Sequence, residues 1–179
     1  MTIHFVHVGA SSGIGAATAA LFSKLGASLA LTGRKEDNLQ KIGQKCSEGN
    51  GEKPLLVPGD LAKEEDIKKV FDKTVEHYGK LNILVNCAGI IELGSIETTS
   101  LQQYDKIFNV NVRSIYYLTM LAVPYLVKSQ GNIVNVSSVN GIRSFPNVLA
   151  YNMSKTALDQ FTRCVALGNN VCPQFRYVC

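Results

Sequence analysis

A tyrosine and a lysine four residues apart, in YNMSK at 151–155, could together move a proton. The spacing places both side chains on one face of a helix, one turn apart. A free tyrosine titrates near pH ~10, and a neighbouring cation stabilises its anion. A redox reaction between a carbonyl and an alcohol needs such a proton donor beside the reacting oxygen. The pair occurs on many surface helices, so it gains weight only from its surroundings.

A glycine-rich stretch, VGASSGIG at 8–15, is the second candidate site. It follows a predicted strand and precedes a predicted helix, which favours a cofactor site over a flexible turn. Glycines at 9, 13 and 15 allow a tight turn and a close approach of the backbone to a pyrophosphate, which the helix N-terminus attracts. A P-loop would need a lysine and then Ser or Thr after the last glycine, whereas two alanines follow. A nucleoside triphosphate site is therefore disfavoured.

The elements that must position these residues alternate between strands and helices. Short apolar segments predict strands at 3–8, 28–32, 54–57, 81–85 and 133–137. Helical periodicity separates them, and a long helix over 101–128 is expected to begin with a capping box of Ser100 and Gln103. The last helix covers 150–167. This alternation predicts an α/β protein with a doubly wound parallel sheet.

Residues 3–167 resemble the short-chain dehydrogenase/reductase family, in its single-domain branch. The glycine spacing Gly-x-x-x-Gly-x-Gly is shared, and Asn86-Cys87-Ala88-Gly89 is similar to the family's Asn-Asn-Ala-Gly, with cysteine at the second position. The resemblance implies a Rossmann-like sheet of strand order 3-2-1-4-5, in which the sixth and seventh strands are missing. It also implies an NADP-binding domain over 1–167 that is incomplete. Among family members, 3-oxoacyl reductases and carbonyl reductases are the most similar in type.

The resemblance also assigns four catalytic residues. Tyr151 is implied as the acid and base, and Ser138 as the residue that orients the substrate oxygen. Lys155 is implied to hold the nicotinamide ribose, and Asn111 to anchor a water that links Lys155 to solvent. The alternative for Ser138 is a polar residue at a strand end, and for Asn111 a residue at a helix kink.

Cofactor binding is expected from a larger set of residues, most of which follow the predicted strands. Asp60, after the third strand, is similar to the family's adenine-contacting aspartate. The full set is Gly9, Ser11, Ser12, Gly13, Ile14, Gly15, Arg34, Asp60, Leu61, Asn86, Ala88, Gly89, Tyr151 and Lys155.

The end of the second strand, LTGR, bears on which nicotinamide cofactor is bound. An acid that holds the ribose 2′-hydroxyl is expected there, but Gly33 takes its place and Arg34 follows. A guanidinium can pair with a 2′-phosphate through charge-assisted hydrogen bonds. The alternative is an exposed arginine that starts a helix. The sequence therefore predicts NADP(H) in preference to NAD(H), with hydride transfer to a ketone or from a secondary alcohol.

Composition argues against several other classes. The 18 basic and 14 acidic residues are interspersed, with no basic block that would indicate nucleic acid. No apolar run is long enough for a membrane span, and the N-terminus does not resemble a signal peptide. Five cysteines without a CxxC pair, and three histidines without ligand spacing, predict no metal site. A cytoplasmic location with free thiols and a small-molecule substrate is expected.

The tail over 168–179, GNNVCPQFRYVC, is atypical of the family. It is interpreted as an alternative exon, a frameshift or a gene-model error that cuts the domain short. The strand before Ser138 would then be an unpaired sheet edge, and the product would be poorly soluble with little turnover. An alternative function is a truncated isoform that only binds nucleotide or pairs with full-length subunits. A sugar-nucleotide epimerase is disfavoured by the glycine spacing.

The resemblance further implies a homo-oligomer that forms through the helices over 101–128 and 150–167. Tyr117, Leu158 and Val165 are expected to face outward from these helices and to be buried between subunits.

Overall fold

The computed structural model describes residues 4–50, 52–168 and 176–178. Strands and helices alternate along the chain as the sequence predicts. Their bounds are β1 His4–Val8, α1 Gly13–Lys24, β2 Ser28–Thr32, α2 Glu36–Asn50, β3 Leu55–Leu56, α3 Glu64–Tyr78, β4 Ile83–Asn86, α4 Leu101–Phe108, η1 Asn109–Arg113, α5 Ser114–Ser129, β5 Asn132–Val136, η2 Val139–Gly141, α6 Leu149–Gly168 and β6 Arg176–Val178.

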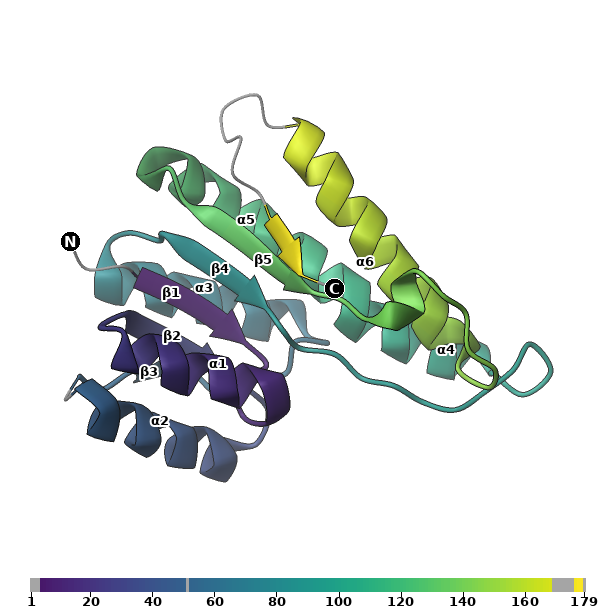
Figure 1. Cartoon of the computed structure of the whole chain (residues 1–179), viewed down its shortest axis with the longest axis horizontal. Coiled ribbons are helices and arrows are strands. Elements are labelled where there is room, and N and C mark those ends of the chain that lie inside the picture. Colours follow the sequence, from purple (N-terminus) through teal and green to yellow (C-terminus); the bar gives the residue numbers. More distant parts are fainter. Residues whose placement is uncertain (1–3, 51, 169–175, 179) are drawn as a thin grey trace.

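The strands form one parallel sheet in the order β3-β2-β1-β4-β5-β6 (Figure 1). β1 lies between β2 and β4, so the chain winds outward from β1 in both directions. The strand order changes direction between the neighbouring strands β1 and β4. Open α/β sheets bind ligands at the carboxyl ends of the strands at such a point. The Rossmann-like fold and the strand order 3-2-1-4-5 are confirmed.

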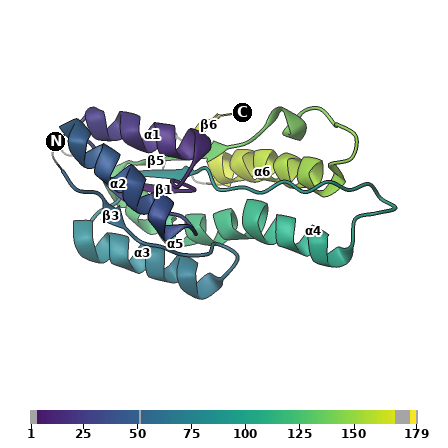
Figure 2. The ribbon, with the colours of Figure 1, turned by 90° about the horizontal axis from the view of Figure 1, so that it is seen from below.

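Helices cover both faces of the sheet and bury a separate core on each (Figure 2). Leu84 of β4 packs in one core with α3 and α5, and the next residue, Val85, packs in the other with α1 and α2. Successive side chains of a strand point to opposite faces. Burial on both faces explains why β2 and β4 are mostly apolar along their length rather than alternating.

The expectation that the sixth strand is missing is wrong. β6 pairs in parallel with β5, and Val134, Asn135 and Val136 lie opposite residues 176–178. Pairing of this kind is made by backbone N–H and C=O groups, so a segment with no apolar alternation can supply it. β5 is therefore an interior strand at these positions. The reason for expecting poor solubility, an unpaired β5, does not hold. Within the described residues no strand follows β6.

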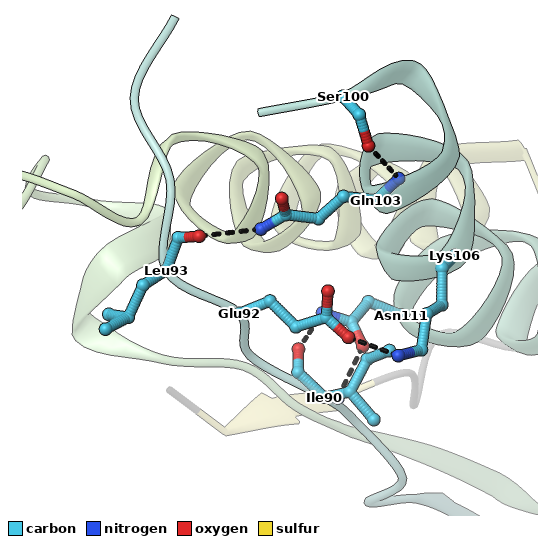
Figure 3. Close-up of polar contacts among 7 residues, drawn as sticks. All are labelled: Ile90, Glu92, Leu93, Ser100, Gln103, Lys106 and Asn111. Carbon is cyan, nitrogen blue, oxygen red and sulfur yellow. Dashed lines mark hydrogen bonds and ion pairs between the residues drawn. The ribbon is translucent and has the colours of Figure 1, made fainter. Parts of the chain in front are cut away.

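The segment expected as one long helix over 101–128 is divided into α4, a π-helical segment η1 and α5. Ser100 caps α4, since its side chain accepts a hydrogen bond from the Gln103 backbone N–H at 3.1 Å. A capping box also needs a hydrogen bond between the Gln103 side chain and the Ser100 backbone N–H, and this part of the prediction is wrong. The Gln103 side chain instead donates to the backbone carbonyl of Leu93 at 2.8 Å (Figure 3), because the loop after β4 runs beside α4 and offers that carbonyl.

The outward residues of α5 and α6 differ from those expected. Leu158 is buried within the chain, and Tyr117 packs partly buried against the core beneath α5. Tyr116 and Met120 are the large exposed side chains of α5, and the Tyr116 ring lies 5.7 Å from the ring of Phe161 on α6. Of the helices in the described part of the chain, none is long and apolar enough to cross a membrane.

Candidate functional site

A cavity of about 320 Å³ opens at the carboxyl edge of the sheet. The loops after β1, β2, β3 and β4 line it, together with the end of β5 and the first turns of α6. Most residues predicted to bind a cofactor are among its lining: Gly9, Ser11, Ser12, Ile14, Gly15, Arg34, Asp60, Leu61, Ala88, Gly89, Tyr151 and Lys155. Gly13, Asn86, Asn111 and Ser138 are not among the lining residues.

The glycine loop lies close to the chain that follows β4. Gly9 has φ +81°, and a Cβ at this position would lie 2.6 Å from the backbone nitrogen of Ala88. No other residue type fits there without displacing backbone. The loop turns back onto β2, where the N–H groups of Gly9 and Ala10 both donate to the carbonyl of Thr32, at 3.1 and 3.0 Å.

The start of α1 faces the cavity without a side-chain cap. Ser12 is the N-cap residue, lines the cavity, and makes no side-chain hydrogen bond to the helix. The first N–H groups of a helix have no partner within it, and together with the helix dipole they attract anions. A phosphate group fits this end of the cavity.

Arg34 is exposed and lines the cavity beside the buried Gly33, which packs on Ser11. Asp60 is the acidic residue of the lining, and its carboxylate accepts a hydrogen bond from the Ala62 N–H at 3.1 Å. Its own backbone N–H donates to Asp66 at 2.8 Å. These bonds fix Asp60 in a turn. Among the described residues, Arg34 forms no ion pair.

Asn86 lies behind the cavity rather than in it. It is fully buried, and its side-chain amide donates to Asn135 of β5 at 2.8 Å. Asn135 in turn donates to Thr162 of α6 at 2.8 Å. This chain of buried hydrogen bonds connects β4, β5 and α6, so in the structure Asn86 helps to place α6 against the sheet.

Lys155 is almost completely buried, and its Nζ lies 5.8 Å from the centre of the Tyr151 ring. The ammonium donates to the backbone carbonyl of Val136 at 3.0 Å. Burial lowers the pKa of Lys155, and the nearby Cys87 and Asp159 raise it in part. The structure therefore brings together the two residues whose spacing predicted proton transfer.

Cys87, which stands where the family pattern has asparagine, lies between the glycine loop and Lys155. Burial raises the pKa of the Cys87 thiol, while the charge of Lys155 and a hydrogen bond from the Gly15 backbone lower it in part. The thiol lines the cavity, so it lies where a cofactor bound across the glycine loop would pass.

Asn111 lies in the π-helical segment and is fully buried. Its side chain accepts a hydrogen bond from the Ile90 N–H at 2.8 Å and donates to the Ile90 carbonyl at 2.9 Å (Figure 3). It also donates to Ser154 at 3.0 Å. A Cβ on Gly89 would lie 3.5 Å from both Asn111 Oδ1 and Lys155 Nζ, so both predicted catalytic residues lie next to Gly89.

Other contacts hold the loop after β4 in place. Glu92 forms an ion pair with Lys106 of α4, and Gln103 holds Leu93 (Figure 3). Farther along, the Gly94 N–H donates to the carbonyl of Asn147 at 2.8 Å, which joins this loop to the one that precedes α6. The wall of the cavity formed by Gly89 and Ile90 is therefore supported from several sides.

Ser138 follows β5 and caps the short helix η2. Its hydroxyl donates to Asn140 Oδ1 at 3.0 Å and accepts from the Asn140 N–H at 3.2 Å. The Asn140 amide then donates to Asn152, next to Tyr151, at 2.7 Å. Ser138 is thus connected to α6 through two asparagines. The neighbouring Ser137 lines the cavity, and its buried hydroxyl has no hydrogen-bond partner among the described residues.

Several residues of the site were not predicted. Ser154 connects Asn111 to the backbone carbonyl of Tyr151, to which it donates at 2.8 Å. Asn140 and Asn152 have no spacing signal in the sequence, because they meet only when the loop folds onto α6. Asp159 could have been found, since it follows Lys155 at the same spacing by which Lys155 follows Tyr151.

The arrangement fits a nicotinamide dinucleotide. An uncapped helix N-terminus beside Gly9 suits the pyrophosphate, the exposed Arg34 can meet an anionic group, and Tyr151 and Lys155 line the same cavity. The unpartnered hydroxyl of Ser137 is available to a ligand there.

Comparison with known sequences agrees with this assignment. A family model described as short chain dehydrogenase matches residues 4–170. The 11-beta-hydroxysteroid dehydrogenase-like 2 protein of Arabidopsis thaliana is 38% identical over 154 residues, which are 86% of this chain and 50% of that protein. An uncharacterized oxidoreductase of Thermotoga maritima is 38% identical over 174 residues, 92% of this chain and 68% of that protein. The chain spans about half the length of the plant relatives.

Solved structures give the same result. An alcohol dehydrogenase from the archaeon Thermococcus sibiricus, complexed with 5-hydroxy-NADP, matches 99% of this chain and 74% of its own with a TM-score of 0.90 and 25% identity. A double mutant of a Serratia marcescens short-chain dehydrogenase/reductase matches 93% of this chain and 68% of its own, with a TM-score of 0.87 and 32% identity.

Proposed function

The chain belongs to the short-chain dehydrogenase family, and on that basis we propose that it is an NADP(H)-dependent oxidoreductase that acts on a ketone or a secondary alcohol. The observation that carries this proposal is the position of Tyr151 and the buried Lys155 in one cavity with the glycine loop. When bound there, the nicotinamide would supply the hydride for reduction or accept it in oxidation.

Proton transfer is the part of the reaction that this chain's own residues perform. Tyr151 donates the proton to the substrate oxygen in reduction and takes it back in oxidation. The Lys155 ammonium, 5.8 Å from the ring centre, stabilises the phenolate that remains. Ser138 orients the substrate oxygen, and this role requires that its hydroxyl give up its bond to Asn140.

Asn111 contributes through position. Both N–H groups of its side chain already donate within the chain, to Ile90 and to Ser154. Among the described residues, its Oδ1 accepts one hydrogen bond, from the Ile90 N–H, so a second lone pair is left for a water linked to Lys155. The Asn111 side chain also keeps the Gly89 wall beside Lys155.

Replacing Tyr151 tests the proposed chemistry. In an assay of NADPH oxidation with a panel of ketones, Tyr151→Phe should lower kcat by about 10²–10⁴-fold, the usual contribution of general acid catalysis. NADPH affinity should change little, because the hydroxyl acts on the proton in the transition state. The exposed Tyr116→Phe is the matched control and should keep its activity.

Undiminished turnover by Tyr151→Phe would remove this residue from the mechanism. NADPH binding without turnover by the unmodified chain would favour an isoform that only binds nucleotide.

The preference for NADP(H) is proposed from Arg34 and from the glycine that precedes it. No carboxylate is placed beside Arg34 by an ion pair within the described residues, so its guanidinium can pair with a 2′-phosphate. Calorimetric titration should give a lower Kd for NADPH than for NADH. Arg34→Ala should weaken NADPH binding by about 10–100-fold, since hydrogen bonds to charged groups contribute ~1.5–3 kcal/mol, and should leave NADH binding unchanged. Lys35→Ala, which alters the next exposed cation, is the control. Equal affinities for the two cofactors would exclude this preference.

A further inference from the structure

Three residues that bear ionisable groups lie on successive turns of α6. Tyr151, Lys155 and Asp159 are four residues apart, a spacing that places side chains on one helical face. Lys155 and Asp159 are each only 4% exposed, while Tyr151 is partly buried at the cavity. The proposed mechanism uses the first two and gives no role to the third.

The carboxylate of Asp159 is buried, with few polar partners among the described residues. Its Oδ1 is buried and has no hydrogen-bond partner among the described residues. Its Oδ2 lies so close to Gly141 of η2 that a Cβ there would overlap it. A buried carboxylate is strongly unfavourable unless an opposite charge compensates it. Two cations lie one turn from Asp159 along α6, Lys155 and Arg163. Arg163 is exposed and forms none of the ion pairs between described residues, whereas Lys155 is buried like Asp159.

Lys155 is a buried cation that likewise lacks an ion pair among the described residues. The hydrogen bond of its ammonium goes to the neutral carbonyl of Val136. Cys87, Tyr151 and Asp159 are the titratable groups that face it. Burial raises the pKa of the Cys87 thiol, so this group is neutral near pH 7 and provides no negative charge. Asp159 is left as the source of one.

We propose that Asp159 is a positioning residue that keeps the Lys155 ammonium charged and directed at Tyr151, an inference that rests on the proposed function. A charged ammonium stabilises the phenolate that Tyr151 becomes after it gives up its proton, and a neutral amine does not. Gly141 permits this arrangement, because a Cβ at this position would overlap Oδ2 of Asp159 and displace its carboxylate.

The charge of Lys155 can be measured without turnover. In the 179-residue chain with carbon-13 at lysine Cε, the Lys155 signal is assigned by its loss in Lys155→Met and then titrated with pH. In Asp159→Asn the midpoint of Lys155 should move to lower pH, because burial is no longer opposed by the carboxylate. Asp159→Glu should restore it, whereas Asp105→Asn, at an exposed site on α4, should leave it in place. An unchanged midpoint in a folded Asp159→Asn variant would overturn the proposal.

A double-mutant cycle keeps the proposal testable if a single variant folds poorly. Lys155→Met alone leaves a buried carboxylate without its counter-charge. The double variant Lys155→Met with Asp159→Asn should therefore be more stable to urea than Lys155→Met alone. Additive losses of stability would overturn the pairing. A shift in the Lys155 midpoint in a chain that reduces no ketone would support the pairing and count against the proposed function, so failures of the two can be told apart.

Discussion

His4 shows how a single residue on the first strand couples stability to pH. Its backbone N–H donates to Asn82 at 3.1 Å, and its ring packs on Tyr78 with a centroid distance of 4.9 Å. The Nδ1 atom is buried without a hydrogen-bond partner among the described residues. Burial lowers the pKa of His4, the nearby Lys80 lowers it further, and Glu52 raises it in part.

The sign of the resulting pH dependence follows from that shift. Below the ordinary histidine value of ~6.5, the unfolded chain binds a proton that the folded chain resists. The free energy of unfolding should therefore fall as the pH drops from about 6.5 through the lowered pKa of folded His4. Urea denaturation between pH 7 and pH 5 measures this. His4→Gln should reduce the loss, and the exposed His77→Gln should keep it. The same slope in all three chains would contradict the prediction.

At the same scale, the sequence predicted the residues that chemistry requires but not those that hold them. Tyr151 and Lys155 were identifiable because their spacing on one helix occurs together with the glycine-rich stretch and the other motifs that resemble the family. Asn86 follows the buried Leu84 by two residues and so lies on the same face of β4. Strand alternation could therefore have indicated that the Asn86 side chain is buried. Asn140 and Asn152 could not be found, because their contact depends on the path of a loop.

At the scale of elements, the strands buried on both faces were the easiest to predict. Short apolar segments predicted β1, β2, β4 and β5 with small shifts at their ends. The π-helical segment η1 was missed, because an extra residue in one turn barely disturbs helical periodicity. β6 was missed because three residues of backbone pairing leave no side-chain pattern.

The pairing of β6 with β5 has a measurable consequence for stability. Tyr177 lies opposite Asn135 in the register. Tyr177→Pro removes a backbone N–H and should disrupt the pairing. We expect a loss of about 1–3 kcal/mol in the free energy of unfolding, the cost of leaving buried polar backbone groups unpaired. Light scattering should also rise as β5 becomes an edge. Tyr177→Thr, which keeps the N–H, is the control, and equal stability of the two variants would show that β6 contributes nothing.

At the scale of the molecule, α5 and α6 present apolar side chains to solvent. Tyr116 and Met120 are 58% and 54% exposed on α5, and Tyr116 reaches Phe161 of α6. Exposed apolar side chains grouped on neighbouring helices are typical of protein interfaces. A homo-oligomer through these helices therefore stays our proposal, with Tyr116 and Met120 in place of the buried Leu158.

Light scattering tests this assembly. Met120→Glu should shift the mass toward that of the monomer, because a charge would be buried without a partner. Leu25→Glu changes another exposed apolar residue, at the end of α1 in the helix layer on the opposite face of the sheet from α5 (Figure 2), and should have no effect. A monomer at high concentration before any substitution would rule the assembly out.

The central place of β1 in the sheet sets an order of events when the chain is made on a ribosome. Val6 pairs with Leu84, which is synthesised 78 residues later. At about 5–20 residues per second, roughly 4–16 seconds pass before β1 has its second neighbour. Tyr151 and Lys155 follow later still. The nascent chain thus completes the phosphate-binding half of the cavity before Tyr151 and Lys155 are synthesised. Under the proposed function, the growing chain gains its cofactor site before it is able to catalyse the reaction.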